Sequence, residues 1–190
     1  EATDSTVVNI TNAGLLQIFA NNAGGAAEAI GNTVVTGNTD EALDVSVESL
    51  VAQAGQSLTG STVHTGANPG GIYISESDDQ ADGFRLLDVD TSNGNIDLRS
   101  TGNVTIDSDD PATTDASVSG RIENVTAGNV DRTAAGNGNV TITAGGTIQE
   151  NTPAGGTATD TNIDAEGDQV ALVAGGDVGA SNAAPLDIES

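Results

Sequence analysis

Short stretches in which apolar and polar residues alternate recur along the chain, separated by glycine and asparagine. In four of them the apolar residues stand two apart: Ile72/Ile74, Ile96/Leu98, Val104/Ile106 and Val140/Ile142. A β-strand directs alternate side chains to opposite faces. The pattern therefore predicts strands with these apolar pairs inside and with Asp97, Thr105 and Thr141 outside.

Other segments follow the same alternation. It predicts ten more inward residues: Val8, Ile10, Leu43, Val45, Val47, Val170, Leu172, Ala174, Leu186 and Ile188. In residues 84–89 the spacing is less regular, and it favours Leu87 and Val89 inside with Phe84 at a corner. Gly-Asn pairs precede several stretches, and glycine supplies the positive φ that a tight corner demands. No convincing helical stripe interrupts this pattern.

The apolar residues are of few kinds. The chain has 25 Gly, one Tyr and two Phe, and it has no Trp, Met or Cys. Aromatic side chains normally carry much of a core's buried area, whereas small β-branched residues suit a narrow, layered interior. We therefore predict an all-β fold, a parallel β-helix (β-solenoid) of short Gly/Asn-punctuated coils. About 20 to 25 residues per coil give roughly eight or nine coils and a rod of about 40 Å.

A longer period overlies the short one. Residues 186–190 (Leu-Asp-Ile-Glu-Ser) repeat residues 43–47 (Leu-Asp-Val-Ser-Val), an offset of 186 − 43 = 143. We interpret residues 1–190 as a single β-solenoid domain, slightly more than one super-repeat of a longer array or fibre. The chain starts at Glu1 without Met, which suggests a processed product or an excised fragment.

The charge is strongly acidic. Against 28 Asp and Glu stand four Arg and no Lys, a formal net charge of −24. Such a surface repels nucleic acid and anionic membranes, so we expect neither nucleic-acid binding nor membrane insertion. Two interpretations stay open: solubility in a salty medium, and binding of divalent cations between neighbouring carboxylates. In both, salt or Ca²⁺ relieves self-repulsion.

One acidic loop resembles a calcium-binding loop. Asp78, Gln80 and Asp82 stand at alternate positions before Gly83, and Ca²⁺ prefers several oxygen ligands converging from a tight loop. The position where an EF-hand loop has a bidentate Glu holds Val89, and no flanking helices are predicted. The alternative is a solvated acidic loop, and residues 107–110 pose the same choice. Ca²⁺ is the one cofactor that the sequence suggests.

No catalytic residues are predicted. His64 is the single histidine, and no Gly-x-Ser-x-Gly motif is present. A polysaccharide-cleaving site needs two carboxyl groups at fixed separation and a groove for the sugar. Only Tyr73, Phe19 and Phe84 could supply aromatic walls. The arginines are interpreted as cross-coil partners of Asp: Arg85, Arg99, Arg121 and Arg132. A polysaccharide-active β-helix enzyme is the remote alternative.

Residues 70–76, 138–146, 174–179 and 185–187 resemble the repeat regions of bacterial filamentous-haemagglutinin-like surface proteins and related giant adhesins. The resemblance implies a right-handed parallel β-helix, export to the cell surface, and a role in adhesion, biofilm or fibre building. The expected partners are other copies of the chain, head to tail or in a covalent array, and host or matrix surface ligands. We therefore expect an extracellular structural rod or filament. The alternative is a calcium-responsive adhesin or binding module.

Overall fold

The computed structural model describes residues 8–11, 14–21, 29–31, 42–56, 71–77, 83–91, 94–107, 125–126, 138–151, 163–165, 169–179, 186 and 188–189. All regular secondary structure in these ranges is β-strand, so the predicted all-β class is confirmed. A search of the same ranges finds no helix long and apolar enough to cross a membrane.

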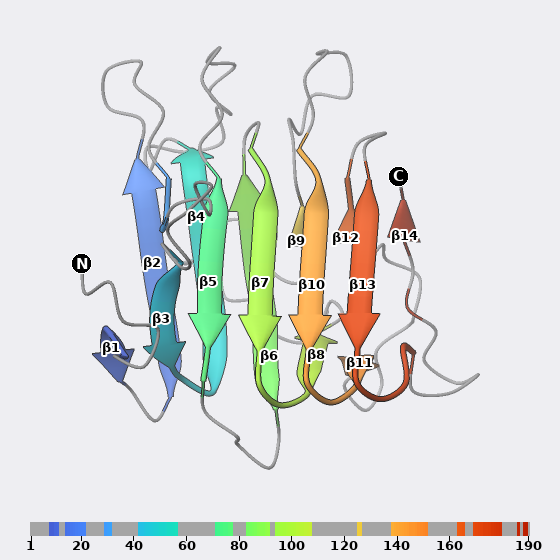
Figure 1. The fold of residues 1–190 in the computed structure, drawn as a ribbon. Helices are drawn as coiled ribbons and strands as arrows, with labels where there is room; N and C mark the ends of the chain where they lie inside the picture. The colour runs from blue at the N-terminus through green and yellow to red at the C-terminus, as the bar shows by residue number, and fades with distance from the viewer. Residues whose placement is uncertain are drawn as a thin grey trace, which may run out of the picture.

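One sheet of the described residues has six strands and lies in front in Figure 1. Its strands follow one another in chain order, and every neighbouring pair is parallel. They are β1 (Ile10–Thr11), β3 (Leu43–Ser46), β5 (Ile72–Glu76), β7 (Ile96–Ser100), β10 (Val140–Ala144) and β13 (Val170–Ala174).

The second sheet has eight strands, also paired in parallel, and lies behind the first (Figure 1). They are β2 (Leu15–Asn21), β4 (Ser49–Gln56), β6 (Phe84–Thr91), β8 (Val104–Asp107), β9 (Val125–Thr126), β11 (Ile148–Asn151), β12 (Ile163–Asp164) and β14 (Ile188–Glu189). The long strand β6 pairs with β8 through its first residues and with β9 near its end. Beyond β6 the sheet therefore divides into β8–β11 and β9–β12–β14.

The chain alternates between the two sheets. Each strand of the six-stranded sheet is followed by a strand, or by a single bridge at Val178, in the eight-stranded sheet. We call such a unit a rung; the first rung is β1 with β2, and the last is β13 with Val178 and β14. Tight turns join the sheets within the last three rungs. These turns stack on one another, with the Gly146 amide 2.9 Å from the Gly102 carbonyl oxygen and the Gly176 amide 2.8 Å from that of Gly146.

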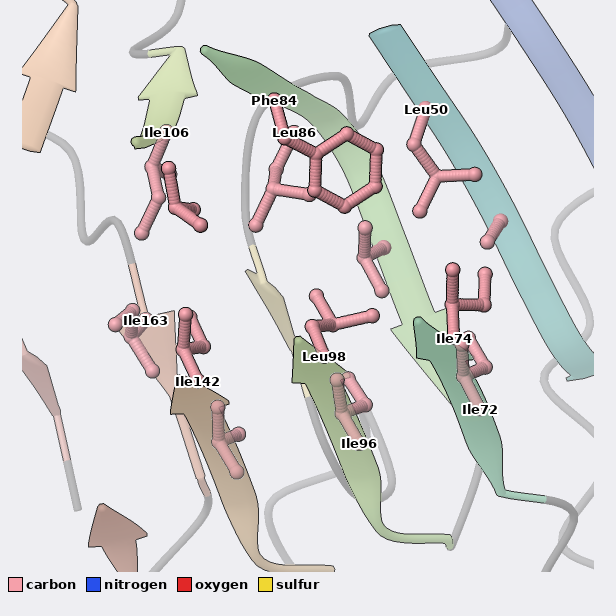
Figure 2. Close-up of a cluster of buried hydrophobic side chains, with 14 of the residues drawn as sticks. Leu50, Ile72, Ile74, Phe84, Leu86, Ile96, Leu98, Ile106, Ile142 and Ile163 are labelled. Atoms are coloured by element: carbon pink, nitrogen blue, oxygen red, sulfur yellow. The ribbon is translucent and has the colours of Figure 1, made fainter. Parts of the chain in front are cut away.

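The core lies between the sheets, and Figure 2 shows side chains from both meeting there. Ile74, Leu98 and Ile142 come from the six-stranded sheet, and Leu50 and Leu86 face them from the other. The four apolar pairs predicted to point inward are all buried. Full burial of one such side chain contributes roughly 1.5–3 kcal/mol. The alternation predicted these strands and their inner face correctly.

The prediction for residues 84–89 is wrong in detail. Phe84 and Leu86 are buried in the core, whereas Leu87 is only partly buried. The pairing of β4 with β6 shifts between Leu50 and Val51, and Leu87 has no partner in β4. One extra residue in a strand reverses the inward and outward positions after it. Val89 therefore points inward as predicted. Before Leu87, however, the inward positions are Phe84 and Leu86, which the alternation counted back from Val89 does not give.

Two residues lie in environments opposite to those predicted. Thr105 was expected on the surface, yet it is 4 % exposed. It pairs with Arg85 on one side and Gln149 on the other, and long side chains at in-register positions share its face. Ile188 was expected inside and is instead 45 % exposed. It lies in β14, the last strand of its branch among the strands that the structure describes.

The corners differ from the prediction in their chemistry. Positive φ occurs in the described residues at Gly31, Gly83 and Gly179, and not at Gly138 of a Gly-Asn pair. Position 138 requires glycine because the two backbones approach closely there. A Cβ at this position would collide with the Gly94 carbonyl oxygen of the neighbouring rung.

The asparagines of the Gly-Asn pairs form hydrogen bonds between neighbouring rungs. The Asn139 amide donates to Asn95 Oδ1 over 2.9 Å, and the Thr147 amide donates to Asn103 Oδ1 over 2.8 Å. The Gln169 amide donates to Asn139 Oδ1 over 3.0 Å. Each corner asparagine therefore fixes the next rung.

The spacing between rungs is irregular. Paired residues of the six-stranded sheet are separated by 96 − 72 = 24, 140 − 96 = 44 and 170 − 140 = 30 residues. Of these three separations, only the first lies within the predicted 20 to 25 residues per coil. The described residues accordingly form six strands in this sheet, fewer than the eight or nine coils expected. Six strands about 4.8 Å apart span about 24 Å.

The two segments that are alike in sequence lie in different places. Val45 belongs to β3 of the six-stranded sheet, whereas Ile188 belongs to β14 of the eight-stranded sheet. Their likeness therefore does not mark the same position in the fold. That the chain belongs to a longer repeat array stays a prediction.

Candidate functional site

The proposed calcium ligands Asp78, Gln80 and Asp82 lie outside the described residues, so the calcium site stays a prediction. Both flanks of this loop are held by neighbouring rungs. The Ser77 amide donates to the Val45 carbonyl oxygen over 3.0 Å, and Gly83 has a φ of 77° beside Asn103. Within the described ranges, no three His, Cys, Asp or Glu side chains gather in a way that could hold a metal ion.

Several other candidates also fall outside the described ranges: His64, Arg121, Arg132 and residues 108–110. Of Asp107 only the backbone is described, in β8. Arg99 lies over Asp97 of its own strand, with Nη2 3.0 Å from Oδ2 and Nε 3.3 Å from Oδ1. That the arginines pair with Asp of other coils stays a prediction.

Tyr73 shares the outer face of the six-stranded sheet with Asp97, its in-register neighbour. Its ring lies over Gly71, where a Cβ would come within 2.5 Å of the ring and hydroxyl atoms. Burial raises the pKa of the Tyr73 hydroxyl, a hydrogen bond with the Asn95 side chain lowers it, and the Asp97 carboxylate raises it. The net direction is upward from 10.0. Tyr73 is therefore a neutral group held against the sheet at neutral pH.

Two side-chain hydrogen bonds between adjacent rungs involve a buried acidic residue. Ser100 Oγ donates to Glu76 Oε2 over 2.8 Å, and both residues are buried at neighbouring positions of β7 and β5. Gln53 Nε2 donates to Asp88 Oδ2 over 2.7 Å, with Asp88 buried. A buried carboxylate is tolerated only when hydrogen bonds compensate its desolvation. These pairs link adjacent rungs, and their burial suits a structural role.

The terminal rungs carry the most conspicuous surface. We call residues that pair in register across successive strands a column. Val178 continues the column of Phe84, Val104 and Ile148, which are buried, yet Val178 is 49 % exposed. Ile188 is the last residue of another column, beside buried Ile163. The last rung therefore presents core-type side chains to solvent.

Outward apolar residues gather on the same rungs. Leu15 and Phe19 of β2, in the first rung, and Val173 of β13, in the last, are exposed. Together with Val178 and Ile188 they make up the exposed large hydrophobic residues of the described chain, and none lies in an inner rung. Exposed apolar residues that cluster mark interaction surfaces more often than singly scattered ones do. Here they cluster at the two ends of the described stack.

The exposure of these residues was not predicted, although the sequence of two strands carries a signal for it. In β2 (LLQIFAN) and β13 (VALVA) apolar residues occupy both inward and outward positions. Inner strands such as β10 (VTITA) keep polar residues outside. A strand that is apolar on both faces is expected to be covered on both. By this criterion, β2 and β13 stand out from β10.

Comparison with protein-family models, with curated proteins and with solved structures gives no match for this chain. The resemblance to haemagglutinin-like repeats accordingly rests on the sequence motifs, and it remains a prediction. Two of those motifs, residues 70–76 and 138–146, contain the described strands β5 and β10.

Proposed function

We propose that the chain is a parallel β-solenoid that serves as a structural extracellular repeat protein, a rigid rod or filament at the cell surface. It would act as a fibre, a matrix component or the stalk of an adhesin. The observation that carries this proposal is the strand order β1-β3-β5-β7-β10-β13, which follows the chain while each strand's successor joins the other sheet. A chain wound in this way stacks rung on rung.

The interior supports a spacer role. Its buried apolar residues are Ile, Val, Leu and Ala with a single Phe, and each rung covers the next. In such a protein the free energy of unfolding is approximately the sum of the stability of each rung and of its contacts with the adjacent rungs. Rungs can therefore be added or removed without a new core. Length and rigidity are the properties that this arrangement supplies.

The charge supports an extracellular location and leaves room for a second candidate. A net charge of −24 keeps copies apart at low ionic strength and soluble at high ionic strength. It also favours the calcium-responsive adhesin or binding module. Melting temperatures in NaCl and CaCl₂ at equal ionic strength separate the two, with Asp78→Asn/Asp82→Asn as the control variant. Extra stabilisation by CaCl₂ that this variant loses supports the calcium module; equal effects of both salts reject it.

The solenoid itself is tested by removing one rung. Deleting residues 96–139 joins Asn95 to Val140, which reproduces the Asn139–Val140 junction because Asn139 stacks on Asn95 44 residues earlier. Ala144→Ser is added so that a hydroxyl replaces Ser100 beside Glu76. We expect this variant to stay folded, with a cooperative unfolding transition and β-sheet circular dichroism.

A protein with one indivisible core does not survive the loss of 44 central residues. Failure of the deletion variant to fold, while a variant carrying only Ala144→Ser folds normally, would contradict the solenoid. Small-angle X-ray scattering adds a second readout, since the folded variant should keep its cross-section and shorten by about 4.8 Å.

A further inference from the structure

We propose that the last rung of this chain docks the first rung of a second copy, so that both sheets continue in parallel across the junction. The inference rests on the proposed solenoid and names the partner of its terminal rungs. Two observations support it. At the last rung, columns of core residues end in exposed apolar side chains, and at the first rung, inward apolar side chains are only partly buried.

Within the described residues, no strand covers the last rung. Val178 and Ile188, in columns whose neighbouring members Ile148 and Ile163 are fully buried, are 49 % and 45 % exposed. Leu172 is only partly buried, although Ile142 beside it in the same column is fully buried. Nothing in the residue types distinguishes these end members from the inner ones. What distinguishes them is that no described strand pairs on their other side.

The first rung is incomplete in the same way. Ile10 of β1 and the inward residues Leu16, Ile18 and Ala20 of β2 are packed against the core yet only partly buried. Their column neighbours in β3 and β4, among them Val45 and Leu50, are fully buried. Both ends therefore leave one face of an apolar layer open.

A second copy is the partner that matches both faces. The exposed edge of β13 requires a parallel strand, followed by a strand that covers Val178 in the other sheet. The unit β1–β2 has that order, since β1 belongs to the six-stranded sheet and β2 to the eight-stranded one. The contact is heterologous, so it repeats from copy to copy. The charge of −24 on each copy opposes it, and association should strengthen with salt.

Continuing the columns fixes the register of the junction. Ile10 pairs with Val45, and the column then runs through Glu76, Ser100 and Ala144 to Ala174. The next member is Ile10 of the docked copy. Asn9 of that copy therefore lies beside Val173, and both residues are exposed in the single chain. Neighbouring strands are about 4.8 Å apart, within the Cα separation of about 4.4–6.8 Å that a disulfide accepts.

Cysteine cross-linking tests this register, because the chain has no cysteine of its own. The single variants Asn9→Cys and Val173→Cys are mixed in about 1 M NaCl, where screening is strongest, and oxidised mildly. We expect the mixed disulfide dimer to exceed both homodimers, and the double variant to give a ladder of reducible multimers. The matched control replaces Val173→Cys by Thr143→Cys, one rung inside in the same column, and should give no mixed dimer.

Sedimentation of cysteine-free variants gives an independent readout. Val178→Asp should weaken self-association at least tenfold, whereas Thr143→Asp, with the same added charge, should leave it unchanged. A mixed dimer no more abundant than with Thr143→Cys overturns the inference, as does a predominance of Val173→Cys homodimers. If the rung-deletion variant folds in that case, the solenoid stands and only its self-docking is lost.

Discussion

Ile142 and Leu172 are neighbours in one column of the six-stranded sheet, and they differ in burial more than in chemistry. Ile142 of β10 is completely buried between β7 and β13, whereas Leu172 of β13 pairs with a described strand on one side only. The same contrast separates Ile148 from Val178 and Ile163 from Ile188.

The comparison shows that two factors decide how much a residue contributes to stability. Alternation along the strand decides which face a side chain takes, and position in the stack decides how much water it loses. Because hydrophobic stabilisation follows the area removed from water, inner rungs should contribute more per residue than terminal rungs. Substitutions in the two kinds of rung should therefore differ in their effect on stability.

A charge inside an inner rung should have the largest effect. Ile106 is fully buried, and Thr105 beside it is also buried. Ile106→Asp should destabilise by about 4 kcal/mol, because an unpaired charge is left in the apolar core. Thr105→Asp should cost less, because Arg85 lies beside it in register. Thr143→Asp, half-buried and paired in register with Arg99, should stay within about 0.5 kcal/mol. Urea unfolding measures all three, and equal midpoints would show that the assigned faces are wrong.

Truncation of column neighbours comes next. Ile142→Ala should cost about 3 kcal/mol, since it leaves a cavity among fixed neighbours. Leu172→Ala should cost about 1 kcal/mol, because its side chain is only partly buried. Chemical denaturation of the two variants measures both losses of stability. Equal losses would mean that β13 is covered as completely as β10.

Loss of an interior hydroxyl should have a moderate effect. Ser100→Ala removes the donor that lies 2.8 Å from Glu76 Oε2 and should cost about 1.5 kcal/mol, a typical value for a hydrogen bond to a charged group. Ser75→Ala, at the outward position next to Glu76, is the control and should change stability little. If the two variants unfold at the same urea concentration, Glu76 does not depend on this bond.

The smallest effect concerns the single tyrosine. The folded-state pKa of Tyr73 is raised above 10.0, the value expected for the unfolded chain. Its contribution to stability is therefore fully present below pH 10.0 and is lost as pH rises through the folded-state pKa. Absorbance near 295 nm reports the titration cleanly, because no other tyrosine or tryptophan is present. Asp97→Asn should move the titration to lower pH, and an unchanged curve would exclude that carboxylate as a cause.

Much of the strand pattern could be predicted from local alternation. The pairs in β5, β7, β8 and β10 point inward as expected, because period-two alternation with one buried face has a single solution. The irregularity at Leu87 was not predictable, since it appears only when β6 is aligned with β4. The burial of Thr105 likewise depends on Arg85 and Gln149, which are distant in sequence.

The terminal surface was predictable in part. That copies associate end to end was an expectation from sequence, but the residues involved depend on which strand is last in each sheet. Ile188 illustrates the problem, because its alternation is that of a core residue while its place at the end of a branch leaves it exposed. The spacing of 24 to 44 residues between rungs was equally hidden, since turn length does not alter strand alternation.

Native-state hydrogen exchange, resolved at single amides, tests the comparison between inner and terminal rungs most directly. Amides of β7 and β10 should exchange only with global unfolding, whereas amides of β13 should open with free energies lower by about 2 kcal/mol or more. The Ile96 and Val140 amides, bonded to the Asn139 and Gln169 carbonyl oxygens at 2.9 Å, are suitable probes. Protection that falls from inner to terminal rungs at monomeric concentration is the predicted result. Equal protection in β10 and β13 under the same conditions would contradict the account.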